Sequence, residues 1–141
     1  MAGYGYPPHV EPRVDCETWS PTEDIGAIDV NGELRLIERV GFAFKASSGH
    51  LISPSDVARV LAAHPAVTDA VVVPLASAHG TLIGALVETS ALDAEDVRRH
   101  ASQSLPGWMQ PQVVCVTRAL PRLVGGKPDR QQSIRQLEPL V

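Results

Sequence analysis

Two apolar runs near the middle of the chain constrain its fold most strongly. DAVVVPLA (69–76) and TLIGALVET (81–89) are each long enough for a strand and too short for a transmembrane helix. The His79-Gly80 turn lies between them, so the two runs are expected to be neighbouring buried strands. A third apolar run, VVCVT (113–117), predicts another strand. A sheet of this kind needs helices to cover it.

The remaining segments supply those helices. SPSDVARVLAAHP (53–65) has Ser53 as a capping residue and apolar residues at helical spacing. A second helix is expected from about Ala94 to Leu105, capped by Asp93, and a last short helix is capped by Asp129. The order of helices and strands after residue 50 predicts the α+β class, with a small three-stranded, mostly antiparallel sheet flanked by helices.

A β-hairpin is predicted to precede this unit. In IGAIDVNGELRLIER (25–39), two alternating runs flank Asn31-Gly32, which is the strongest short hairpin signal. Between this hairpin and the first helix, Phe42 and Phe44 alternate before Ser47-Ser48-Gly49, which predicts a short strand and a turn. Residues 1–18 are rich in proline and glycine without periodicity, and are expected to form an extended arm.

Composition excludes several classes of partner. The net charge is −4 without a dense Lys/Arg cluster, and aromatic residues make up only 4% of the chain, so neither nucleic acid nor an anionic membrane is an expected partner. Cys16 and Cys115 fit no metal spacing and no disulfide scaffold, so no metal site is expected. The N-terminal residues lack the basic and apolar regions of a signal peptide, and a cytoplasmic location is expected by default.

Five ordered segments resemble the C-terminal portion of the adenylate-forming superfamily, which comprises acyl- and aryl-CoA ligases, peptide-synthetase adenylation domains and luciferases. The resemblance covers about residues 19–137. The segments are WSPTED (19–24), GELRLIER (32–39), FKASSGHLISPSDV (44–57), HPAVTDAVVV (64–73) and LPRLVGGKPDR (120–130). Any one of them is a weak signal, but five in the right order at roughly the right spacing form a specific pattern.

The resemblance implies that Lys127 is the catalytic lysine of carboxylate adenylation. In that reaction negative charge builds between a carboxylate and the α-phosphate of ATP, and a cation aimed there lowers the barrier. A compact ammonium on a flexible stem suits this role, and Gly125 and Gly126 are expected to let the backbone approach the other domain. The alternative is an ordinary surface lysine after a Gly-Gly turn.

The resemblance also assigns roles to four other residues. Asp24 and Arg39 match residues that contact the ATP ribose, Gly41 falls at the hinge, and Gly49 lies in the loop that reaches the thiol tunnel. The alternatives are a turn aspartate for Asp24, a strand-end charge for Arg39 and a plain turn glycine for Gly49.

Some positions depart from the family pattern. Glu23 and Glu38 replace glycines that lie near the nucleotide, where two carboxylates would repel phosphate. Residues 19–41 are expected to be a hairpin from the edge of the large domain, with the hinge, and residues 42–141 the mobile lid domain. Because no phosphate loop or acyl pocket is recognisable, the chain is not expected to form an adenylate by itself.

Three functions remain open. The first is the lid portion of an acyl- or aryl-CoA ligase-like enzyme, working with a separate large adenylation domain that holds ATP and Mg²⁺, with CoA or phosphopantetheine as a candidate thiol. The second is a non-catalytic interaction module that binds a ligase or an acyl carrier protein. The third is an unrelated regulatory domain that binds a small ligand. Self-association is also expected, because the hairpin lacks its usual neighbour.

Overall fold

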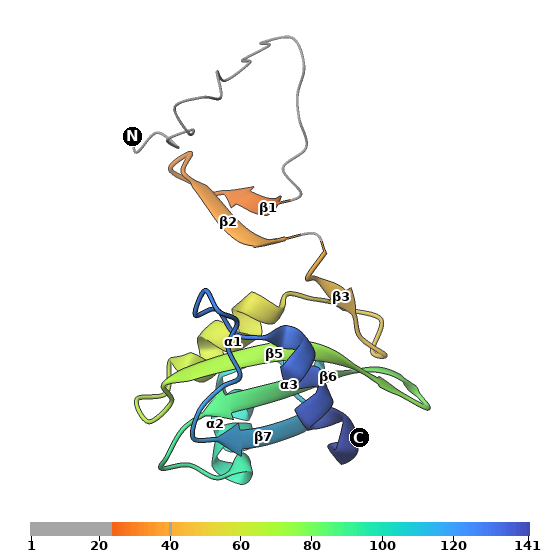
Figure 1. The fold of residues 1–141 in the computed structure, drawn as a ribbon. Coiled ribbons are helices and arrows are strands. Elements are labelled where there is room, and N and C mark those ends of the chain that lie inside the picture. The colour runs from red at the N-terminus through yellow and green to blue at the C-terminus, as the bar shows by residue number, and fades with distance from the viewer. Residues whose placement is uncertain (1–23, 40) are drawn as a thin grey trace, which may run out of the picture.

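The structure is a computed structural model that describes residues 24–39 and 41–141 (Figure 1). The expected arm over residues 1–18, and residues 19–23 of the first family segment, lie outside the described residues. The described elements, in chain order, are β1 (Asp24–Ile28), β2 (Leu34–Arg39), β3 (Phe44–Lys45), β4 (Leu51–Ile52), α1 (Pro54–Ala62), β5 (Asp69–Ser77), β6 (Gly80–Glu88), α2 (Ala94–Ser104), η1 (Gly107–Met109), β7 (Val113–Thr117), α3 (Arg130–Leu137) and η2 (Glu138–Leu140).

The central sheet has the strand order β5-β6-β7. Strands β5 and β6 form an antiparallel pair from Asp69 opposite Glu88 to Ser77 opposite Gly80, whereas β7 lies parallel to β6. The predicted α+β class is confirmed, with the small sheet, the flanking helices and the preceding hairpin. The sheet is mixed because helix α2 lies in the connection between β6 and β7. This crossover returns the chain to the end of the sheet where β6 begins, so β7 runs in the same direction as β6.

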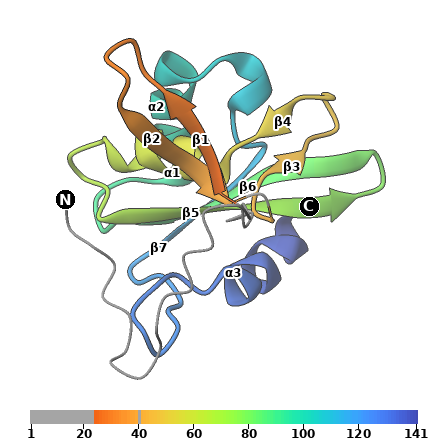
Figure 2. The same cartoon turned by 90° about the horizontal axis from the view of Figure 1, so that it is seen from above.

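Helices cover both faces of this sheet, so its strands are apolar on both sides. In β5, Ala70 and Val72 belong to the cluster that includes residues of α1 and α2, whereas Val71 and Val73 belong to the cluster that includes Leu137 of α3. This alternation follows the two-residue period of a strand. Figure 2 shows α1 and α2 on one side of the sheet and α3 on the other.

The three predicted helix caps are confirmed. Ser53 Oγ accepts a hydrogen bond from the backbone N–H of Asp56, and Asp93 forms a capping box with Asp96. Asp129 Oδ1 accepts from the backbone N–H of Gln132 at 3.0 Å. Each cap satisfies an N–H group that has no partner inside its helix.

The predicted hairpin is present as β1 and β2, but its turn is longer than a two-residue connection. The N–H of Gly32 donates to the carbonyl of Asp29, and the N–H of Asp29 donates to the carbonyl of Glu33, both at 3.0 Å. Gly32 adopts a φ of 82°, which favours glycine. The carboxylate of Asp29 also accepts from the N–H groups of Asn31 and Glu33, and these bonds stabilise the wider turn.

No helix among residues 24–39 and 41–141 combines the length and apolar character needed to cross a membrane.

Candidate functional site

Lys127 lies at the end of a tight loop. The N–H of Gly126 donates to the carbonyl of Leu123, and the N–H of Leu123 donates to the carbonyl of Lys127, both at 2.8 Å. Gly126 has a φ of 82°, whereas Gly125 has neither a positive φ nor a neighbour that a Cβ atom would meet. In this structure the glycine at 126 is therefore required by the turn, and the glycine at 125 is not. The side chain of Lys127 is exposed.

The Lys127 loop borders an open groove of about 680 Å³. The other walls come from the segment after the hairpin, the start of α1, β5 and α3, and include Phe42, Phe44, Pro74 and Ile134. Most of this lining is apolar, and Lys127 lies at its edge. The groove thus places one exposed ammonium beside a space that a second molecule or domain can enter.

Arg130 also lines this groove and was not identified from the sequence. Its guanidinium lies 4.4 Å from the centre of the Phe42 ring and donates to the carbonyl of Val72 at 3.1 Å. Burial lowers the pKa of Arg130, while the nearby Glu38 carboxylate opposes that effect. The contact with Phe42 joins the segment after the hairpin to α3.

Asp24 and Arg39, the two predicted ribose contacts, lie directly opposite each other across the hairpin. Arg39 Nε is 3.3 Å from Asp24 Oδ1, and the Arg39 side chain is largely exposed. The hairpin therefore brings the two residues together, as a joint role requires. A carboxylate has several acceptor sites and a guanidinium several donors, so this contact leaves part of each group for other partners.

Gly41, the predicted hinge, lies in a turn just after β2. The N–H of Phe42 donates to the carbonyl of Arg39 at 2.9 Å, which closes the turn. A Cβ atom at Gly41 would meet no atom within 4 Å, and its φ is not positive. A side chain is thus compatible with this conformation, and the glycine adds backbone freedom here without being required by it.

Gly49, in the predicted thiol-tunnel loop, occupies the turn between β3 and β4 with a φ of 84°. The turn is attached to the central sheet because the N–H of Ser47 donates to the carbonyl of Thr81 at 2.8 Å. Next to it, the rings of His50 and Trp108 stack with centroids 4.6 Å apart. Figures 1 and 2 both show this turn on the opposite side of the molecule from the Lys127 loop.

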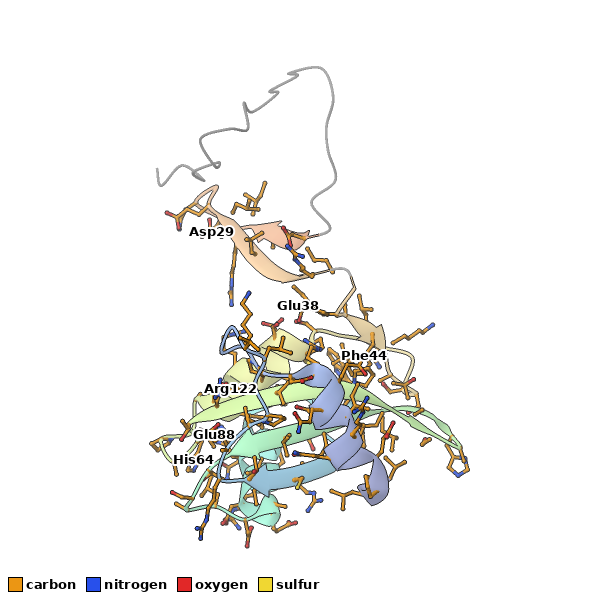
Figure 3. All side chains as sticks on the ribbon, in the orientation of Figure 1. Asp29, Glu38, Phe44, His64, Glu88 and Arg122 are labelled. Atoms are coloured by element: carbon orange, nitrogen blue, oxygen red, sulfur yellow. The ribbon has the colours of Figure 1, made fainter. Side chains whose placement is uncertain are left out.

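Glu38, one of the departures from the family pattern, is buried, and its carboxylate lies at the N-terminus of α1 (Figure 3). Its Oε2 accepts from the N–H of Ser55 at 2.9 Å, and its Oε1 accepts from the N–H of Arg39 at 3.1 Å. The positive end of α1 favours this negative charge. Glu38 therefore joins the hairpin to α1.

Arg122 was also missed, because its partners are distant in the sequence. The hydrogen bond to Asp69 is the main cause that raises the pKa of Arg122 above its usual value, and the hydrogen bond to Glu88 adds to it.

Within residues 24–39 and 41–141, no three His, Cys, Asp or Glu side chains form a group that could hold a metal ion.

Comparisons with known proteins agree with this fold. The family model described as the AMP-binding enzyme C-terminal domain matches residues 56–127. A 4-coumarate–CoA ligase of Arabidopsis thaliana is 27% identical over 143 residues, covering 98% of this chain and 25% of that protein. An isonitrile lipopeptide synthase of Streptomyces coeruleorubidus is 38% identical over 112 residues, covering 77% of this chain and 8% of that protein.

Solved structures give the same result. An amide bond synthetase from Marinactinospora thermotolerans is 26% identical with a TM-score of 0.73, covering 83% of this chain and 24% of that one. An O-succinylbenzoate Coenzyme A synthetase from Bacillus subtilis, in complex with AMP, is 27% identical with a TM-score of 0.69, covering 79% of this chain and 23% of that one. The chain spans about a quarter of the length of the ligases it matches. Since the family model matches half of its residues, the chain belongs to the AMP-binding enzyme C-terminal domain family.

Proposed function

We propose that this chain is the C-terminal lid portion of an ATP-dependent acyl- or aryl-CoA ligase-like enzyme, and that it supplies Lys127 to a large adenylation domain. The observation that carries the proposal is the position of Lys127. It is exposed at the edge of an open groove, on a loop whose backbone is fixed by hydrogen bonds, at the place where the family pattern has its catalytic lysine.

In the first half-reaction, a carboxylate oxygen of the substrate attacks the α-phosphorus of ATP and pyrophosphate leaves. The ammonium of Lys127 donates hydrogen bonds to oxygens that gain charge in this step, and stabilises the transition state more than the ground state. Asp24 would accept hydrogen bonds from the ribose hydroxyls, with Arg39 beside it. Mg²⁺, held by the large domain, would neutralise phosphate charge.

In the second half-reaction, a thiol of CoA or phosphopantetheine attacks the acyl carbon of the adenylate and AMP leaves. The lid would turn about Gly41 so that the Gly49 turn, rather than Lys127, faces the reacting centre. Support for this comes from the separation of the two loops on opposite sides of the molecule (Figures 1 and 2). We therefore propose that the two half-reactions use two orientations of the lid.

A chimera tests the proposal. In it, this chain replaces the matching C-terminal quarter of a 4-coumarate–CoA ligase, and ATP–pyrophosphate exchange and thioester formation are measured separately. We expect exchange well above that of the large domain alone. The ligase carrying its own C-terminal segment, regrafted in the same way, is the control. Exchange no higher than that of the large domain alone would contradict the proposal.

The second candidate is an interaction module derived from such a lid, which binds a ligase or an acyl carrier protein without catalysis. The observation that favours it is the bond between Glu38 and the N-terminus of α1, because it holds the hairpin on the lid at the point where the family needs rotation. This candidate predicts a chimera that binds its partner but is no more active than the large domain alone. Capture of a carrier protein by the whole chain would support it.

A further inference from the structure

Asp69 and Glu88 place two carboxylates directly opposite each other at one end of the β5–β6 pair. Like charges in this arrangement destabilise an antiparallel pair unless a cation lies between them. Arg122 supplies that cation (Figure 3). Its Nη2 donates to Asp69 Oδ2 at 3.0 Å and to Glu88 Oε2 at 3.2 Å. The same Glu88 oxygen accepts from the N–H of Leu120 at 2.9 Å.

The other terminal nitrogen of Arg122 binds the Lys127 loop. Arg122 Nη1 donates to the carbonyl of Gly126 at 3.2 Å, and this carbonyl belongs to the peptide that leads into Lys127. The carbonyl of Lys127 itself accepts from the N–H of Leu123. Hydrogen bonds therefore hold the carbonyls on both sides of the Lys127 Cα atom, while its side chain remains exposed.

We propose that Arg122 is the positioning residue for Lys127: it attaches the loop to the carboxylate pair at the end of the central sheet. The inference rests on the proposed function, because it concerns the group that acts in adenylation. Arg122 itself does not line the groove beside Lys127. A planar fork of donors can bind the two carboxylates with one nitrogen and the carbonyl with the other, whereas a lysine ammonium at this position could not reach all three groups in the same geometry.

A purely structural role would be to neutralise Asp69 and Glu88. Two variants distinguish this neutralising role from the positioning of Lys127. Arg122→Met removes the donors and leaves the carboxylates facing each other. The triple variant Asp69→Asn/Glu88→Gln/Arg122→Met also removes the repulsion, and the amide oxygen that it introduces at position 88 can still accept from the N–H of Leu120. Both variants leave the carbonyl of Gly126 without its side-chain donor.

The first readout is made on the whole chain without a partner. We expect amide hydrogen exchange at Leu123 and Gly126 to be faster by at least about 10-fold in both variants, because loosening a loop exposes its amides. The thermal midpoint should fall in Arg122→Met and recover in the triple variant. Arg118→Met, which changes an exposed arginine with no hydrogen bond among the described residues, is the matched control and should alter neither quantity.

The second readout is the pair of half-reactions in the ligase chimera. Both variants should slow adenylation by roughly 10- to 100-fold, since a misplacement of about 1 Å can cost 100-fold. Thioester formation from preformed adenylate should fall much less. If the triple variant restores both normal exchange and normal adenylation, Arg122 only neutralises the carboxylates and the proposal is overturned.

Lys127→Ala, measured in the same chimera, separates the two proposals. If Lys127→Ala abolishes adenylation while Arg122→Met leaves it unchanged, the proposed function stands and the role of Arg122 is overturned. If Lys127→Ala has no effect, the proposed function fails. In that case the exchange at Leu123 and Gly126 still decides whether Arg122 holds the loop, because unchanged exchange in both variants contradicts it.

Discussion

The carboxylate of Glu38 accepts a hydrogen bond from the backbone N–H of Ser55 at 2.9 Å, so the end of strand β2 caps helix α1. The two residues are 17 positions apart. This bond gives an N–H group at the start of α1 a partner that the helix itself cannot provide, and adds a negative charge where the helix dipole favours one.

We therefore expect Glu38→Ala to destabilise the chain by about 1 kcal/mol, the usual cost of a lost helix cap. Hydrogen exchange at the Ser55 amide should accelerate, since its acceptor is removed. Glu33→Ala, which changes an exposed carboxylate in the hairpin turn, is the matched control and should leave both quantities unchanged. Equal melting temperatures for Glu38→Ala and the unmodified chain would argue that solvent replaces the carboxylate without cost.

Lys127→Ala should leave stability almost unchanged, within about 0.5 kcal/mol, because the side chain is exposed and the loop is held by its backbone. In the ligase chimera, adenylate formation should fall by roughly 100- to 1,000-fold, as for other lost charge-stabilising groups. Thioester formation from preformed adenylate should fall much less. Arg135→Ala on α3 serves as the control for loss of an exposed cation. Survival of both half-reactions would make Lys127 an ordinary surface residue.

The hairpin should drive self-association of the isolated chain. Ile28, Leu34 and Leu36 are 74%, 69% and 64% exposed, and the pairing of Ile28 with Leu34 places them on one face. Exposed apolar faces of this kind recruit a partner or a second copy. Light scattering should detect oligomers that disappear when all three residues are changed to Thr. Changing only Leu123, which is exposed outside the hairpin, should not dissociate them.

A monomer at high concentration, with protected amides throughout residues 25–39, would contradict this prediction. Ile25 is half-buried, so it is left unchanged in the experiment.

Gly84 in β6 should not tolerate a side chain. A Cβ atom there would lie 2.5 Å from Leu75 Cδ1 and 3.2 Å from Leu137 Cδ1, both of which are buried between the sheet and α3. We expect Gly84→Ala to destabilise the chain by about 1–3 kcal/mol in chemical denaturation, as is typical of overpacking. Gly107→Ala is the control, because no atom lies within 4 Å of the added Cβ. Equal stability of the two variants would mean that Leu75 can move aside.

The sequence alone determined most of the elements and their ends. Strand β7 was predicted over its observed residues, and the caps at Ser53, Asp93 and Asp129 are in place. Such features depend on periodicity and on hydrogen bonds between residues that are close in the chain, so short segments carry the information. The family segments likewise identified Lys127, Asp24 and Arg39 as candidates, and their proposed roles remain predictions.

Only the tertiary structure decided which groups meet. Arg122 lies 53 residues from Asp69 and 34 from Glu88, and no spacing rule connects them. In the sequence, Glu38 is only a charged residue at a position where the family pattern has glycine. The fold brings its carboxylate to the start of α1. The parallel pairing of β7 with β6 also depends on how α2 returns the chain to the sheet. Local patterns determine the period and the ends of an element, whereas its neighbours depend on burial of its apolar faces, which involves the whole chain at once.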